Sequence, residues 1–219
     1  MTTESLAPQV KPLLRGVLHQ GAFFVAVAVG ILVCIYAEGT RATFGAAVFA
    51  ASVVGMLGVS TLYHRVTWTP PVRLWMRRLD HAGIYLLIAG TYTPVGLMVV
   101  HGTLSHVVLA VVWCGAAAAI ALKFLWVEAP KWLSAVIGLA LGWVGVIAMP
   151  QVWSHAGAPA VVLLGIGGLA YTLGALVYAF RRPRLAPDIF GYHELFHALT
   201  IVAVACQYVA IAFFVLHIG

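Results

Sequence analysis

Long apolar runs alternate with short polar connectors along this chain. A helix that crosses a bilayer needs about 20 mostly apolar residues, and each run has about that length. The strict alternation of apolar and polar positions that a transmembrane β-barrel requires is absent. The pattern therefore predicts an all-α integral membrane protein with seven transmembrane helices, at residues 17–37, 43–64, 80–100, 107–126, 132–150, 160–180 and 192–217.

The connectors are short, so we expect a single transmembrane domain over residues 1–219, with 1–12 as a short cytoplasmic tail. The first run is too long for the apolar core of a signal peptide, and no convincing cleavage site follows it. Gly138 and Gly142 form a G-x-x-x-G pair in the fifth run. Such a pair commonly lets two helices approach closely, and we expect a packing seam there.

Composition supports the membrane assignment. Hydrophobic residues make up 63% of the chain and charged residues only 8%, against about 25% charged in soluble domains. The net charge of +6 arises from Lys and Arg in the connectors, where such residues orient a membrane protein and contact anionic headgroups. We therefore expect membrane lipids and no nucleic acid as partners. The expected location is the cell membrane, which is the inner membrane if the source is bacterial.

The distribution of basic residues predicts the orientation. Eleven of the twelve Lys and Arg fall in the tail and in the connectors that lie on the same side as the tail, whereas the other side has only Arg41. Cytoplasmic loops are enriched in Lys and Arg. The N-terminus is therefore predicted in the cytoplasm and the C-terminus outside.

Several ionisable residues lie within or beside the spans, where an unpaired charge is costly. Ser60 and His64 are four residues apart near the end of the second run, Asp80 begins the third, and His193 and His197 are four apart at the start of the seventh. Residues four apart share a helix face. The predicted topology places all five near the cytoplasmic face, so the sequence predicts one shared site.

These residue types suit a catalytic zinc (Zn2+) site. His64, His193 and His197 would provide three neutral ligands and leave a fourth position for water, whose pKa zinc lowers to about 7. Asp80 could accept a proton from that water or orient it, and Ser60 could hydrogen-bond the water or a substrate oxygen. His81 is rotated about 100° from Asp80 on a helix and is a candidate to support the ligands from behind.

Alternatives remain for individual residues. The string from His193 to His197 also fits H-E-x-x-H, in which Glu194 would be the general base of a metalloprotease; equally, Glu194 could face the headgroups. Asp80 could instead simply pair with Arg77 or Arg78. The remaining histidines are expected to be solvated or interfacial: His19, His101, His106, His155 and His217.

Three motifs resemble a known family. S-T-L-Y-H at 60–64, L-D-H-A-G-I-Y-L-L-I-A-G-T-Y-T-P at 79–94 and G-Y-H-E-L-F-H at 191–197 resemble the bacterial hemolysin III group of the progestin and adipoQ receptor family. The resemblance covers nearly the whole chain. It implies a seven-helix fold with zinc near the cytoplasmic leaflet, held by His64, His193 and His197, with Asp80 and Ser60 around the bound water. The more distant alkaline ceramidases share the sparse pattern of Ser, Asp and three His.

Because relatives include both receptors and lipid amidases, the fold alone does not choose a function. The leading hypothesis is a zinc-dependent hydrolase, similar to ceramidases, that cleaves an amide or ester bond of a lipid with an acyl chain at the cytoplasmic leaflet and serves membrane homeostasis. A non-enzymatic membrane-state sensor with structural zinc and an intramembrane metalloprotease are the alternatives. Direct cytolysis is not expected, since nearly every segment requires lipid; lysis would be an indirect effect.

Overall fold

The protein is helical almost throughout. The computed structural model describes residues 12–183, 185–186 and 188–217, and within them the β-structure is limited to one isolated bridge, Ala186 to Phe190. Each predicted span coincides with helix, which confirms the all-α class. The helices are α1 (Val17–Tyr36), α2 (Thr40–Arg65), α3 (Pro70–Met98), α4 (Gly102–Leu125), α5 (Lys131–Trp143), α6 (Met149–Phe180) and α7 (Tyr192–Ala210), with a 3-10 turn at Val144–Ala148 and a π-helical turn at Ile211–Val215.

The helices present an apolar exterior. Five segments are long and apolar enough to cross a membrane: Val17–Tyr36, Thr40–Arg65, Gly102–Leu125, Lys131–Phe180 and Tyr192–Val215. Large apolar side chains on the outer surface are exposed, among them Phe24, Ile31 and Leu173. Such a surface requires lipid rather than water as its solvent. The α3 helix is not among the five segments; its second half is rich in Gly, Thr and Tyr and largely buried.

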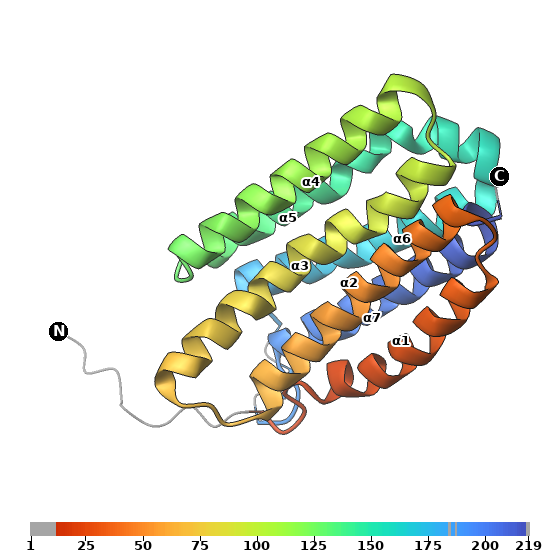
Figure 1. The fold of residues 1–219 in the computed structure, drawn as a ribbon. Coiled ribbons are helices and arrows are strands. Elements are labelled where there is room, and N and C mark those ends of the chain that lie inside the picture. Colours follow the sequence, from red (N-terminus) through yellow and green to blue (C-terminus); the bar gives the residue numbers. More distant parts are fainter. Residues whose placement is uncertain (1–11, 184, 187, 218–219) are drawn as a thin grey trace, which may run out of the picture.

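The helices pack in chain order into a closed ring, in which α7 returns to α1. Helix α2 packs against α1 and α3, α3 against α4, α6 against α5 and α7, and α7 against α1. In Figure 1, α3 runs between α2 and α4, while α4 and α5 lie together at one side. Because α7 closes onto α1, the first and last helices of the chain meet.

Two helix boundaries differ from the hydropathy pattern. Helix α3 begins at Pro70, about three turns of Arg-rich sequence before the apolar run; prolines suit a first turn, where the missing N–H has no partner in any case. Helix α6 begins at Met149 and is broken at Gly157, whose φ of 81° is not helical. In these two helices the apolar run therefore covers only part of the helix.

The expected packing seam at Gly138 and Gly142 was wrong. A Cβ at Gly142 would meet no atom within 4 Å, and one at Gly138 would meet only Ile88 Cδ1 at 4.0 Å. The close approach occurs between α2 and α3 instead, where a Cβ on Gly90 would lie 2.5 Å from Ser52 Cβ. The glycines of α5 line a cavity.

Candidate functional site

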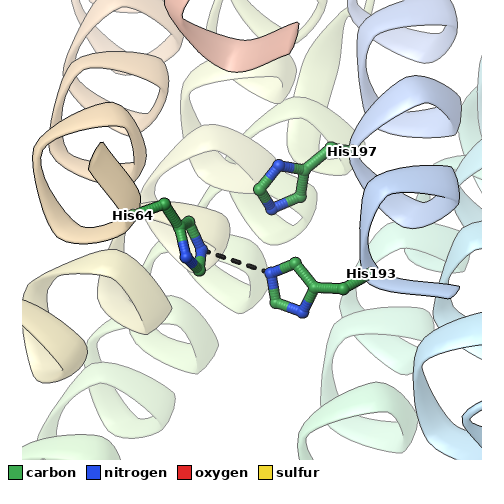
Figure 2. A group of neighbouring side chains, drawn as sticks. All are labelled: His64, His193 and His197. Carbon is green, nitrogen blue, oxygen red and sulfur yellow. Dashed lines mark hydrogen bonds between the residues drawn. The ribbon is translucent and has the colours of Figure 1, made fainter. Parts of the chain in front are cut away.

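Three histidines meet at the end of the bundle where α2 ends and α3 and α7 begin, which we call the histidine end. The ring nitrogens of His64, His193 and His197 that could bind a metal all lie within 4.8 Å of one another. Figure 2 shows the three rings turned toward one another, with 3.2 Å between His64 Nε2 and His193 Nε2. His64 and His197 are buried and His193 is half-buried. Two helices far apart in sequence thus form one group that can hold a metal ion.

The helical spacing brings about this convergence. His193 and His197 are one turn apart in the first two turns of α7, so both project toward the end of α2. His64 is the second-last residue of α2 and faces inward, with 6% of its surface exposed. Side chains four apart lie one above the other on a helix face, which is why the H-x-x-x-H spacing yields a pair of converging rings.

Asp80 and Ser60 lie beside this group. The Asp80 Oδ2 atom is 4.0 Å from His64 Nε2, and the Asp80 side chain is only 14% exposed. Ser60 lies one turn before His64 on α2 and is 3% exposed. The five residues singled out from the sequence therefore occupy one small volume. Asp80 forms no ion pair with Arg77 or Arg78 among the described residues.

His81 lies next to Asp80 and also lines the cavity. Its Nδ1 is 2.6 Å from the Arg77 carbonyl oxygen and 3.8 Å from Asp80 Oδ2. Its Nε2 is 3.5 Å from the Tyr178 hydroxyl on α6. His81 thus connects the first half of α3 to α6 and lies beside the Asp80 carboxylate.

The expectation that His19 is solvated was wrong. His19 is only 2% exposed, and its ring stacks on that of His197 with 3.7 Å between centroids and 6° between planes. Its Nδ1 is 2.9 Å from Ser60 Oγ. The sequence signal was available, because His19 lies just inside an apolar run, as His64 does. Of the other histidines set aside with it, His101, His106, His155 and His217 are exposed.

Glu194 makes its contacts at the start of α7. One carboxylate oxygen is paired with Arg15 Nε, and the other accepts a hydrogen bond from the Gly191 amide at 2.8 Å. The Glu194 side chain is 1% exposed. The second bond caps α7 and places negative charge at a helix N-terminus, where it is favourable. Both oxygens are therefore already used structurally.

The segment before α1 closes the histidine end. The amides of Leu13 and Leu14 donate to the carbonyls of Asp188 and Ile189, in the connector before α7. Gly16 follows with φ of 80°, and a Cβ there would lie 2.6 Å from His64 Cβ. Glycine is required at this position by both the backbone conformation and the close approach.

A long apolar cavity begins at the histidine group. It has a volume of about 360 Å³ and reaches His193, His197, Ser60 and Asp80 at one end. Its lining residues on α3 run from Asp80 to Gly96, roughly 24 Å along the helix axis. The walls are predominantly apolar and come from α3, α5, α6 and α7, for example Ile84, Ile88, Leu139, Leu164 and Phe196. The site thus combines a polar end with a hydrocarbon-like interior.

The Arg15–Glu194 pair predicts a specific stability effect. Glu194→Gln keeps an oxygen that can cap α7 but leaves Arg15, which is 23% exposed, without its counter-charge. We expect a loss of up to about 3 kcal/mol in stability, measured as a lower Tm in detergent. Arg15→Gln combined with Glu194→Gln should restore part of the loss. The control is Glu128→Gln, which breaks an exposed pair with Arg77 and should change Tm little; equal effects of the two single variants would contradict the account.

Comparisons with known proteins agree with the motifs. Residues 8–208 match the family model described as "Haemolysin-III related". The chain is 29% identical over 167 residues to the hemolysin-3 homolog of Bacillus subtilis (strain 168), which covers 76% of this chain and 75% of the relative. It is 29% identical over 169 residues to hemolysin-3 of Bacillus cereus, covering 77% and 74%.

A plant protein extends the relationship. The chain is 29% identical over 185 residues to heptahelical transmembrane protein ADIPOR2 of Oryza sativa subsp. japonica, covering 75% of this chain and 79% of the relative. This likeness supports the expected link to the progestin and adipoQ receptor family. No solved structure matches. Given the family match over most of its length and its apolar helices, the chain is a multi-pass protein of the cell membrane and belongs to the haemolysin-III family.

Proposed function

We propose that this protein is a zinc-dependent hydrolase that cleaves an amide or ester bond of an acyl lipid at the cytoplasmic leaflet. The observation that carries the proposal is the placement of the three-histidine group, Asp80 and Ser60 at one end of a long apolar cavity. A metal group alone would suit a structural role. A metal group that opens onto a cavity of ligand size suits a reaction on a mostly apolar molecule.

The histidine geometry supports zinc. Imidazole nitrogens are common zinc ligands at 2.0–2.1 Å in tetrahedral geometry, which would separate two ligand nitrogens by about 3.3 Å. The Nε2 atoms of His64 and His193 are 3.2 Å apart. His197 lies within the same 4.8 Å group, and small rotations of its ring would complete a three-nitrogen site.

The neighbouring residues suit hydrolysis. A bound zinc ion would supply Lewis acidity and a water activated near neutral pH. Hydrolysis adds water across the C–N or C–O bond; Asp80 would accept the proton from the water and return it to the leaving nitrogen or oxygen. Ser60 would hydrogen-bond the water or the substrate carbonyl and thereby orient it.

The cavity supports a lipid substrate. Its volume of about 360 Å³ lies within the range of small-molecule sites, about 300–1,000 Å³, and it extends from the polar end along α3. Gly142 on α5 and Gly165 on α6 line it, are exposed, and would meet no atom within 4 Å if they carried a Cβ. An acyl chain could enter from the bilayer through this thin wall between α5 and α6.

The geometry favours Asp80 over Glu194 as the base. Both oxygens of Glu194 are bound, by Arg15 and by the Gly191 amide. Asp80 approaches His64 from another helix and lines the cavity. The intramembrane metalloprotease therefore has less support than the lipid hydrolase, despite its H-E-x-x-H string.

We also propose that the chain crosses the membrane seven times with the N-terminus in the cytoplasm. Helices that follow each other along the chain pack side by side, joined by short connectors. The described Lys and Arg residues lie at the histidine end except Arg41, which begins α2 at the other end. Because positive residues favour the cytoplasmic side, the candidate site would face the cytoplasmic leaflet.

The proposed topology can be tested with reporters. A reporter active only in the cytoplasm should be active when fused before Met1 and inactive when fused after Gly219. A reporter active only outside the membrane should give the reverse pattern. Activity of the cytoplasmic reporter at the C-terminus would contradict the seven-span topology and the depth of the site.

The hydrolase proposal predicts a separation of metal binding from turnover. Purified protein would be incubated with a membrane lipid extract and with a synthetic N-acyl sphingoid lipid, and released fatty acid measured by mass spectrometry. We expect release that a chelator abolishes and that zinc restores. Asp80→Asn should keep one zinc per chain but lose about 10²–10⁴-fold in rate, since general-base loss typically has this size.

Matched variants make this test specific. His193→Ala and His197→Ala should lose most of the zinc, whereas His106→Ala, at an exposed position on α4, should retain both zinc and turnover. Fatty-acid release that persists with chelator, or an unchanged rate in Asp80→Asn, would contradict the proposal. Zinc binding without turnover of any lipid would favour the membrane-state sensor.

A further inference from the structure

His19 is a buried polar residue to which the proposed reaction gives no role. It lies in the first turn of α1, is 2% exposed and lines the cavity. A polar ring in the apolar interior of a membrane protein is costly unless it is partnered. Such residues commonly serve function, so the contacts of His19 need an explanation.

His19 contacts two residues of the candidate site, Ser60 and His197. Nδ1 lies 2.9 Å from Ser60 Oγ, and the ring stacks nearly parallel on His197. His19 does not belong to the group of nitrogens within 4.8 Å of one another, so it is not positioned as a ligand. Its Nε2 is buried and makes no hydrogen bond to any residue that the structure describes.

The contact with Ser60 joins α1 to the residues beside the histidine group. Ser60 lies one turn before His64 on α2, and Ser60 and Asp80 line the same cavity as His19. His19 Nδ1 and the Ser60 hydroxyl lie within hydrogen-bond distance, and either can donate, depending on the tautomer of the ring. This bond restrains the Ser60 hydroxyl, while the stacked ring of His19 restrains the ring of His197.

His19 is itself held in place without any metal. Arg15, four residues earlier, is paired with Glu194 on α7, and the amides of Leu13 and Leu14 bond to the connector before α7. These bonds fix the start of α1 against the start of α7. The position of His19 is thus set by the protein framework.

We propose that His19 is a positioning residue: it orients the Ser60 hydroxyl and the His197 ring, so that α1 completes a site whose ligands come from α2 and α7. The proposal rests on the proposed metal site but concerns only contacts between residues of this chain. Groups that orient metal ligands typically change metal affinity by 10–100-fold when removed.

Three substitutions separate the two contacts. His19→Phe keeps a ring that can stack on His197 but cannot bond Ser60. His19→Asn places an amide near the position of Nδ1 and loses the stacked ring. His19→Ala removes both contacts, and His106→Ala is the control for loss of an exposed histidine.

The measurement uses the full-length protein in detergent with zinc and cobalt as probes. For His19→Ala we expect one metal per chain, a Kd for zinc that is 10–100-fold weaker in competition with a chelator, and a changed cobalt absorption band. His19→Phe should change the cobalt band less in a Ser60→Ala background than in otherwise wild-type protein, because the effect of losing the His19 bond is transmitted through Ser60. Wild-type affinity and an unchanged cobalt band in folded His19→Ala would overturn the proposal, as would complete loss of metal, which would make His19 a ligand.

A metal-free measurement separates this proposal from the proposed function. In chelated protein, the Tm losses from His19→Phe and Ser60→Ala should be less than additive, because both remove the same hydrogen bond. Additive losses would overturn the proposal even if the protein binds zinc. If wild-type protein binds no metal, the proposed function fails, while this cycle still decides whether His19 positions Ser60. If His19→Ala does not fold, His19→Asn and His19→Phe carry the same test.

Discussion

The ion pair between Arg15 and Glu194 joins the segment before α1 to the first turn of α7, at the end of the bundle where the site lies. In a bilayer, charges near the apolar core need partners of opposite charge, and Arg15 and Glu194 are such partners for each other. The pair holds the start of α1 against the start of α7. That contact brings His19 onto His197, places Gly16 against His64, and closes the ring of helices around the histidine group. A site assembled from four helices thus depends on a partly buried ion pair, together with the backbone bonds of Leu13 and Leu14 to the connector before α7.

The interior divides into a polar end and an apolar remainder. At the histidine end, buried and half-buried polar side chains contact one another: His19 with Ser60, His64 with Asp80 and His81 with Tyr178. Beyond them the cavity is lined mainly by aliphatic and aromatic groups of α3, α5, α6 and α7. This arrangement matches a molecule with a reactive polar linkage attached to a hydrocarbon chain, which is the chemical reason for proposing an acyl lipid as substrate.

Much of this could be predicted from the sequence, because two simple periodicities determine it. Apolar runs of bilayer length gave the helices, and spacings of four residues placed Ser60 with His64 and His193 with His197. What escaped prediction depends on contacts between helices. The burial of His19 depends on the contacts that hold the start of α1 against α7, and the open space at Gly142 depends on how α5 packs with the helices around it. Neither feature can be seen in a local sequence pattern. Helices such as α3, which begins at Pro70, also extend beyond the apolar region that hydropathy detects.

The central claim is that three imidazoles from α2 and α7 hold one zinc ion. X-ray absorption at the zinc edge of the purified protein tests it most directly. The account predicts nitrogen and oxygen neighbours at about 2.0–2.1 Å, with the outer-sphere pattern of three imidazole rings, reduced in His193→Ala and unchanged in His106→Ala. Sulfur neighbours at about 2.3 Å, or a spectrum that His193→Ala leaves unaltered, would contradict it.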